Sequence, residues 1–422
     1  MTVLHISTEL SGGAGGFVKN LHLAMLEMGM PSLVLTRERS ELVGVITIRP
    51  FTRMAASFRA RVLTALNKLG LLDSSYAPFG IEKCPVLLAD IQPKLKNIKP
   101  STIIFYWTSY FVNFNTMLEL HYAYPDASIV LVCTDEAFLT GGCHYSNSCK
   151  GYMHSCTACP ATSSAWLQQR ISEKFVQKKE IIDTIDPIVI YPTTNIQSMG
   201  RRSSAMKDVR SHVVPLGVVT PFELNRVNSM RSLVIGDHED EDARVLLLIR
   251  SSSEYRKGCD LFVDALKILN QQFSDLRDVL KVISIGDSTL SSSSIGQYID
   301  HIAMGLVSRE ELLGLYGRVD MLLVTSREDG GPLMINESIA LNVFVISTPV
   351  GVAKDLINSG VNGQITKNIS SEAIAESLKN FIEQFSQGDI KYNLFVNKES
   401  QTPLTLTFDN YIQSVLSVVA AE

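Results

Sequence analysis

Short apolar runs alternate with helical patterns along both halves of this chain, and this alternation constrains the fold more than any other feature. The runs of the first half are TVLHIS (2–7), PSLVLT (31–36), STIIFYW (101–107), SIVLVC (128–133) and PIVIYP (187–192). Those of the second half are RVLLLIR (244–250), LKVISIG (280–286), VDMLLVT (319–325) and VFVISTP (343–349). Continuous apolar runs of this length are typical of strands buried in parallel sheets. The chain is therefore predicted to form two α/β domains with parallel sheets.

The length of 422 residues fits two large domains. We expect a first domain over residues 1–200 and a second over 201–402. The last segment, 403–422, is predicted to contain a helix that packs back on the first domain. The region around the boundary holds VVPLGVVTPFEL (213–224) and then the acidic run GDHEDEDAR (236–244), which is typical of a solvated loop.

Charge and cysteine content limit the partners and the compartment. A net charge of −5 and a pI near 6.0 argue against nucleic acid as a partner. The opening MTVLHIS has no basic region before an apolar one, and no run approaches the roughly 20 apolar residues of a spanning helix. The seven cysteines are an odd number, which favours reduced thiols. We expect a cytoplasmic protein.

A glycine-rich turn, SGGAGG (11–16), follows the first strand and opens a helical pattern. Glycines let the backbone approach a ligand closely, and the free N–H groups of a helix N-terminus favour an anion. The alternative is an ordinary tight turn, because such turns are common in α/β proteins.

Cations and carboxylates follow two strands of the second half. Arg250, Arg256 and Lys257 lie between a strand and a helix, where they could neutralise a pyrophosphate or be ordinary surface residues. In SREDGGPLMINESIA (326–340), Asp329 lies in a Gly-Gly-Pro loop and Glu337 in the helix after it. Ligands of open α/β sheets bind beyond the carboxyl ends of strands, so one carboxylate can bind sugar hydroxyls and the other a ribose.

Several of these segments together resemble one enzyme family. EDGGPLMINESIALNVFVISTPVGVAKDLINSGVNG (328–363) is similar to the E-x7-E region of the family 4 retaining glycosyltransferases, which have the GT-B fold. Residues 11–36, the turn at 213–224, RKG (256–258) and residues 304–329 are also similar to that family, in the same order along nearly the whole chain. CTDEAFLTGGCHYSNSCKGYMHSCTACP (133–160) resembles the subgroup that builds bacterial exopolysaccharide, O-antigen or capsule.

The resemblance implies a fold and a reaction. Two Rossmann-like domains would face each other across a cleft, and a sugar would move with retention from a UDP- or GDP-sugar to a growing glycan, which we expect to be lipid-linked. No cofactor is required for such a transfer. A rival interpretation is a non-catalytic nucleotide-sugar-binding or scaffolding subunit, since Thr134 stands where the family usually has a histidine. His144, ten residues later, is not expected to replace that histidine, whereas Asp135 remains.

The family's functional residues can be carried over to matching positions. The catalytic residues implied are Lys257, Arg250, Asp329 and Asp135. The donor-binding residues implied are Gly12 and Gly13 at the phosphates, Arg256, Met304 and Gly305 near the base, Gly330, Gly331, Pro332 and Leu333 around the sugar, and Glu337 at the ribose.

Four cysteines, Cys143, Cys149, Cys156 and Cys159, form the pattern C-x5-C-x6-C-x2-C. Four thiolates within seventeen residues could bind a structural zinc tetrahedrally. Reduced thiols that pack a loop, disulfides and an iron–sulfur site are the alternatives.

The segment 52–72 holds Arg53, Arg59, Arg61 and Lys68 and no acidic residue, and its apolar residues have helical spacing. Such a helix could lie on an anionic membrane or meet a lipid-pyrophosphate acceptor at the inner face of the plasma membrane. The alternative is a helix that packs on the first domain with its basic residues in water.

Overall fold

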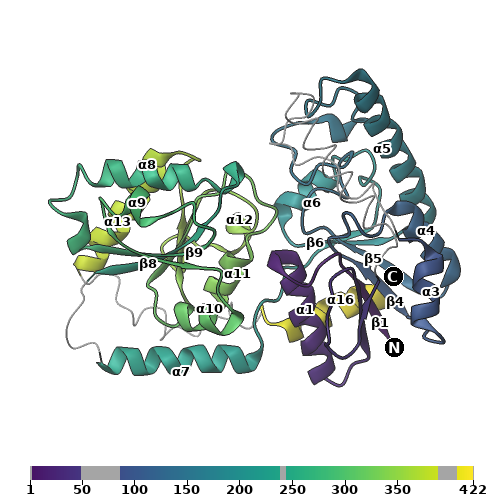
Figure 1. The fold of residues 1–422 in the computed structure, drawn as a ribbon, viewed down its shortest axis with the longest axis horizontal. Helices are drawn as coiled ribbons and strands as arrows, with labels where there is room; N and C mark the ends of the chain where they lie inside the picture. The colour runs from purple at the N-terminus through teal and green to yellow at the C-terminus, as the bar shows by residue number, and fades with distance from the viewer. Residues whose placement is uncertain (1, 49–85, 238–243, 388–405, 422) are drawn as a thin grey trace. The chain divides into compact units, whose positions relative to one another are not determined.

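The computed structural model describes residues 2–48, 86–237, 244–387 and 406–421, which form two compact units (Figure 1). The first unit comprises Met1–Pro215 together with Ile412–Glu422, and the second comprises Leu216–Tyr411. The division lies after Pro215 rather than after residue 200, because a short strand, β7 (Ser211–Val213), still pairs with the first sheet.

The first unit contains a seven-stranded parallel sheet with the order β3-β2-β1-β4-β5-β6-β7. Its five predicted strands are confirmed: β1 (Val3–Ile6), β2 (Ser32–Thr36), β4 (Thr102–Phe105), β5 (Ser128–Val132) and β6 (Ile188–Tyr191). The sequence did not reveal β3 (Val45–Thr47) or β7, which have three residues each and no fully buried side chain.

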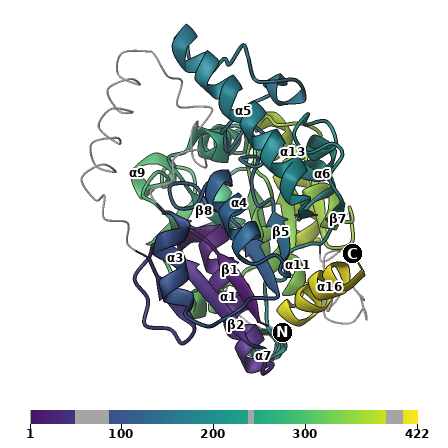
Figure 2. The same ribbon diagram turned by 90° about the vertical axis from the view of Figure 1, so that its right-hand side faces the viewer.

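Helices cover this sheet. They are α1 (Gly12–Glu27), α3 (Leu88–Leu95), α4 (Phe114–Ala123), α5 (Ala165–Ile185), α6 (Thr194–Gly200) and most of α16 (Phe408–Ala421), with a 3-10 turn, η2, at Gly151–Met153. In Figure 2, α4 and the long α5 run alongside each other, and they are in contact.

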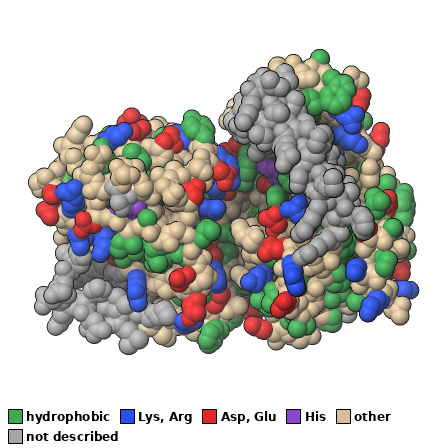
Figure 3. All heavy atoms as spheres, viewed as in Figure 1, with side chains coloured by type: hydrophobic (Ala, Val, Ile, Leu, Met, Phe, Trp, Pro, Cys, Tyr) green, Lys and Arg blue, Asp and Glu red, His purple; other side chains and the backbone are tan. Residues whose placement is uncertain are grey.

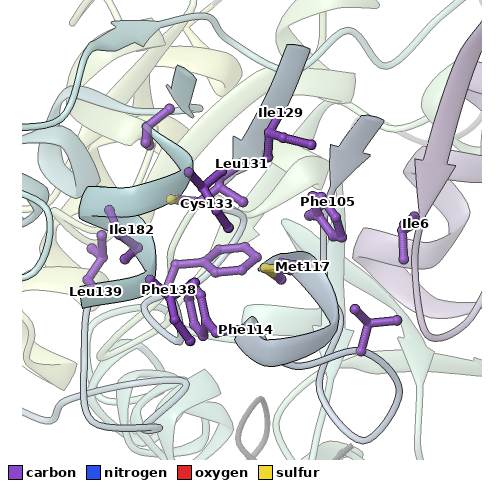
Figure 4. Packing of buried hydrophobic residues seen from close by; sticks show 14 of the residues in the cluster. Ile6, Phe105, Phe114, Met117, Ile129, Leu131, Cys133, Phe138, Leu139 and Ile182 are labelled. Carbon is purple, nitrogen blue, oxygen red and sulfur yellow. The ribbon is translucent and has the colours of Figure 1, made fainter. Parts of the chain in front are cut away.

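The core of the first unit fixes the segment that follows β5. Figure 4 shows Cys133, Phe138 and Leu139 packed among buried residues of the sheet and of α4 and α5. The rings of Phe114 and Phe138 meet edge to face at 6.0 Å. These apolar anchors lie on both sides of Asp135, so the backbone around that carboxylate is held from both ends.

A buried lysine reinforces the same segment. Lys178 of α5 is 1% exposed, and its ammonium donates to the carbonyl oxygens of Ala137 (2.9 Å) and Thr140 (2.5 Å). It also lies 5.1 Å from the centre of the Phe114 ring. Since a buried charge is tolerated only when it is well bonded, Lys178 is a structural tie between α5 and the turn after β5.

The second unit contains a six-stranded parallel sheet with the order β10-β9-β8-β11-β12-β13. The four predicted strands are confirmed: β8 (Val245–Ser251), β9 (Leu280–Gly286), β11 (Met321–Val324) and β12 (Phe344–Ser347). The edge strands β10 (Asp300–Gly305) and β13 (Gly363–Ile365) were not predicted. Strand β10 is largely exposed, so it lacks the continuous apolar run that marks a buried strand.

Helices cover both faces of this sheet (Figure 1), and a separate hydrophobic core lies on each face. One joins the sheet to α8 (Cys259–Leu269) and α13 (Ser371–Ser386), and the other joins it to α7 (Pro221–Asp237), α10 (Arg309–Tyr316) and α11 (Leu333–Ala340). The shorter elements of this unit are η3 (Tyr255–Lys257), η4 (Leu276–Asp278), α9 (Ser292–Ile295) and α12 (Ala353–Leu356). Both units are therefore α/β layers of the doubly wound type.

The surface bears on two predictions about partners, the absence of a nucleic-acid partner and a contact with an anionic membrane. Acidic and basic side chains mix over the face drawn in Figure 3, outside the grey atoms, without a large area of one sign. None of the helices in the described ranges is both long and apolar enough to cross a membrane. The basic segment 52–72 lies outside the described residues, so its predicted membrane contact stays a prediction.

We predict that Lys178→Met lowers the free energy of unfolding by about 1–3 kcal/mol, because two buried carbonyl oxygens lose their donor while the volume is kept. Urea denaturation of the full chain measures it. Lys179→Met is the matched control: Lys179 forms an exposed pair with Asp183 at 2.6 Å, whose loss should cost less than about 1 kcal/mol. Equal effects of the two substitutions would contradict the structural role of Lys178.

Candidate functional site

The second sheet reverses its strand order between β8 and β11. From β8 the chain adds β9 and β10 on one side, and then β11, β12 and β13 on the other. In such sheets the loops after the two central strands diverge and leave a crevice at the carboxyl edge, where ligands bind. The segment after β8 carries Arg256 and Lys257, and the segment after β11 carries Asp329.

The two loops are held together by their backbones. Gly258 has φ +68°, and a Cβ at this position would lie 2.1 Å from the carbonyl oxygen of Thr325. Thr325 in turn donates its hydroxyl to the carbonyl oxygen of Lys257 at 2.9 Å. The N–H of Arg327 donates to the carbonyl oxygen of Arg256 at 2.6 Å. A glycine is therefore required after Lys257, and the cations are fixed relative to the loop that follows β11.

The predicted cations and Asp329 converge at this point. Lys257 donates to the carboxylate of Asp329, and Arg256 approaches the same oxygen at 3.5 Å. The positive charge of Arg250, at the end of β8, acts on Lys257 as well. The N–H of Gly331 donates to the other oxygen of Asp329 at 3.2 Å. Lys257, Arg256 and Asp329 thus form one charged cluster, with Arg250 near enough for its charge to act on Lys257.

Electrostatics keep the members of this cluster charged. Burial alone would raise the pKa of Asp329, which is 8% exposed, but Lys257 and Arg256 outweigh burial and hold that pKa below its ordinary value. Burial lowers the pKa of Lys257, and Asp329 offsets part of that effect. An anionic ligand such as a diphosphate would replace the carboxylate as a partner of the ammonium.

Glu337 lies in the second turn of α11, with its carboxylate inside a separate network. Arg309 donates to Oε1 at 2.5 Å, and the hydroxyl of Tyr316 donates to Oε2 at 2.8 Å. Burial raises the pKa of Glu337, and Arg309 is the largest opposing influence. Neither partner was predicted, because Arg309 lies 28 residues from Glu337 in the sequence and looks like an ordinary residue at the start of a helix.

Arg309 also binds the segment with which the second unit begins. Its Nε donates to Glu223 at 3.0 Å, and its Nη2 donates to the carbonyl oxygen of Val218 at 2.6 Å. Asn336, next to Glu337, donates to the carbonyl oxygen of Leu216 at 3.0 Å. The start of α11 and of α10 are therefore tied to the same short stretch of chain.

The remaining predicted residues of the second unit lie along the same edge of the sheet. Gly330, Gly331 and Pro332 form the loop between Asp329 and α11, and Leu333 is the first residue of that helix. Met304 and Gly305 end β10, two strands away from β8. Met304 is 39% exposed and Gly305 has open space on its Cβ side, so both can be approached by a ligand.

The first sheet has its own reversal of order, between β1 and β4. Gly12 and Gly13 begin α1 directly beyond β1, as predicted, and Gly12 has φ +71°. A carboxylate already lies near this helix start: Glu38 accepts the N–H of Leu10 at 2.7 Å and the hydroxyl of Ser11 at 3.1 Å. The negative charge of Glu38 opposes a second anion there, which weakens the predicted phosphate role of these glycines.

Asp135 follows β5 and pairs with His144, which the sequence analysis did not expect to take part. The Nδ1 of His144 lies 2.6 Å from an Asp135 oxygen, and its Nε2 lies 3.2 Å from the hydroxyl of Ser109. Since Nδ1–H donates to Asp135, it does not also accept from Trp107, whose indole nitrogen is 3.3 Å away. The turn at 136–143 folds back, which brings His144 beside Asp135 although nine residues of sequence separate the two.

The four cysteines lie in the irregular segment between β5 and α5, and all are free thiols. The thiol of Cys143 donates a hydrogen bond to the sulfur of Cys159. This hydrogen bond lowers the pKa of Cys159 to about 7 and raises the pKa of Cys143. The N–H of Gly151 donates to the sulfur of Cys149 at 3.4 Å. Across the described ranges, no three His, Cys, Asp or Glu side chains converge in a group that could hold a metal ion. The zinc site stays a prediction.

Residues 235–392 match the family model of glycosyl transferases group 1. No curated protein sequence matches the chain. Three solved structures similar in fold are sucrose-phosphate synthase from Thermosynechococcus elongatus (14% identity, TM-score 0.63, all of both chains covered), Anabaena HepE in complex with UDP (13%, 0.57, all of both chains) and WaaG, a glycosyltransferase involved in lipopolysaccharide biosynthesis (13%, 0.58, 96% of this chain and 98% of that one).

The family match covers the part of the chain in which the charged cluster lies. The second unit carries a glycosyl transferases group 1 domain, and the matched residues include the whole cluster around Lys257 and Asp329. The chain has the GT-B fold, with two Rossmann-like parallel-sheet domains.

We predict that the purified full-length protein contains about one zinc per chain, because four thiols in one loop offer the ligand set that zinc prefers. The four side chains would have to move together around the ion, since they form no metal-binding group in the described residues. To bind zinc, the thiols of Cys143 and Cys159 would have to break the hydrogen bond between them and coordinate the ion instead. Metal analysis of the wild type, Cys159→Ser and Cys259→Ser checks this: the first variant should lose zinc, and the second, a buried thiol of α8, should keep it. Wild-type protein free of zinc would contradict the prediction.

Proposed function

We propose that this protein is a retaining glycosyltransferase that moves a sugar from a nucleoside diphosphate sugar to a growing glycan. The observation that carries the proposal is the cluster of buried Asp329 with the partly buried Lys257 and Arg256 at the strand reversal of the second sheet, within the segment that matches the family model. UDP is the nucleotide we favour, because HepE, similar in fold, was solved with UDP and with UDP-glucose.

The proposed chemistry depends on the leaving group. As the bond between the anomeric carbon and the phosphate oxygen breaks, the diphosphate gains negative charge and the sugar becomes oxocarbenium-like. Lys257, with Arg250 and Arg256, would stabilise the diphosphate, because cations placed in advance act where charge develops. Asp329, released from Lys257 by the donor, would accept hydroxyls of the sugar together with the N–H groups of residues 330–333.

The acceptor hydroxyl would attack the anomeric carbon on the face that the diphosphate leaves. Its proton would pass to the departing phosphate oxygen, so the new bond keeps the configuration and no side-chain nucleophile is needed. Glu337 would bind the ribose, and the backbone near Met304 and Gly305 the base. In the first unit, Asp135 and His144 would hold a sugar hydroxyl, since an imidazole fixed by a carboxylate is a well-oriented hydrogen-bonding group.

We further propose a lipid-linked glycan as the acceptor and a role in bacterial surface polysaccharide synthesis at the inner face of the plasma membrane. Support comes from the resemblance of residues 133–160 to that subgroup and from WaaG, whose described role is in lipopolysaccharide biosynthesis. The anomeric configuration of the product, measured by NMR, tests retention. An inverted product would refute the proposed reaction course.

We predict that Lys257→Ala lowers transfer or donor hydrolysis by at least about 100-fold, because the leaving diphosphate loses its buried cation. Release of UDP from UDP-sugars by the purified protein measures it. The control is Lys267→Ala on α8, an exposed lysine paired with Asp264 at 2.7 Å, which should leave the rate unchanged. Wild-type rates in Lys257→Ala protein with an intact fold would refute the role of Lys257.

We predict that His144→Ala lowers transfer by about tenfold or more, the expected effect of losing a hydrogen bond to substrate. The control is His154→Ala, which removes a histidine from the same irregular segment. The rate and the thermal unfolding midpoint are measured for both variants. If His144→Ala lowers the midpoint but not the rate, the pair with Asp135 is structural only.

A further inference from the structure

The carboxylate of Glu337 keeps half of its hydrogen-bonding capacity open. A carboxylate accepts at about four lone-pair positions, two on each oxygen. In the part of the chain that the structure describes, Arg309 bonds Oε1 and the hydroxyl of Tyr316 bonds Oε2. One acceptor position therefore remains on each of the two oxygens. Two hydroxyls on neighbouring ring carbons are spaced to donate to the two oxygens of one carboxylate.

The donors that hold Glu337 are themselves fixed. Arg309 also donates hydrogen bonds from Nε and Nη2 to Glu223 and from Nη2 to the carbonyl oxygen of Val218, so its guanidinium cannot rotate without breaking four hydrogen bonds. Tyr316 is fully buried and lies at the other end of the same helix, α10. The orientation of the Glu337 carboxylate is thus set by one rigid helix rather than by the ligand.

We propose that Arg309 and Tyr316 are positioning residues of the donor site. They orient Glu337 so that its two open acceptor positions meet the 2′- and 3′-hydroxyls of a ribose, and they thereby make the site select ribonucleoside over deoxyribonucleoside diphosphates. This inference rests on the proposed function, because it takes a nucleoside diphosphate as the group that the site binds. It adds the cause of the selectivity and the residues responsible.

Calorimetric titration of the full-length chain with UDP and with 2′,3′-dideoxy-UDP tests this. The wild type should bind UDP at least about tenfold more tightly, because a site built for hydroxyls is left unpaired without them. Arg309→Met should bring the ratio close to one by weakening UDP alone, and Tyr316→Phe should lower it in part. Arg226→Met is the control: Arg226 pairs with Glu310 at an exposed position on α7, and its loss should leave the ratio unchanged.

The other possible outcomes of this titration each decide between the inference and the proposed function. If Arg309→Met weakens both ligands equally, Arg309 supports the fold alone and the inference is wrong. A wild-type ratio near one, with UDP bound, removes the ribose site but leaves the proposed function standing. Wild type that binds neither UDP nor GDP overturns both. If thermal unfolding shows that Arg309→Met does not fold, Tyr316→Phe decides, and an unchanged ratio in that variant overturns the inference.

Discussion

The parallel pairing of β8 with both β9 and β11 is the constraint on which the rest of the second unit depends. Because all three strands run in one direction, every connection must return to the opposite edge through a helix, and every loop that follows a strand emerges on one edge. The reversal of order at β8 then separates two neighbouring loops. That geometry brings Lys257 and Asp329 together across 72 residues of sequence. The charged cluster is thus a product of topology more than of local structure.

Buried strands and their order along the chain could be predicted from the sequence. Nine strands with continuous apolar runs were located, and the convergence of Lys257 and Asp329 was expected from their places after strands. The missed strands are those that bury little. Strand β3 has three half-buried residues, and β10 exposes Ile302 and Met304 because it lies at the sheet edge. Sheet edges are chosen by pairing partners, which the residues of one strand alone do not specify.

Contacts that depend on how a loop folds back could not be predicted. His144 reaches Asp135 because Lys178 and the apolar anchors Phe138 and Leu139 shape the turn between them. No short motif in the sequence records that combination. Arg309 likewise appeared as a helical residue, whereas its role comes from three acceptors on α11 and on the stretch after Pro215. In both cases the signal lies in burial and charge, which become visible once the chain is folded.

The contact between Gly258 and Thr325 has a consequence for how such an enzyme can change its donor. With no room for even one methyl group between the two backbones, the spacing of the loop that carries Arg256 and Lys257 from the loop that carries Asp329 is fixed by main-chain atoms. Evolution or design cannot widen that gap by exchanging side chains. Under the proposed function, room for a bulkier sugar would have to come from the stretch between Gly330 and α11, and the contacts of Lys257 and Arg256 with the diphosphate would stay the same across donors.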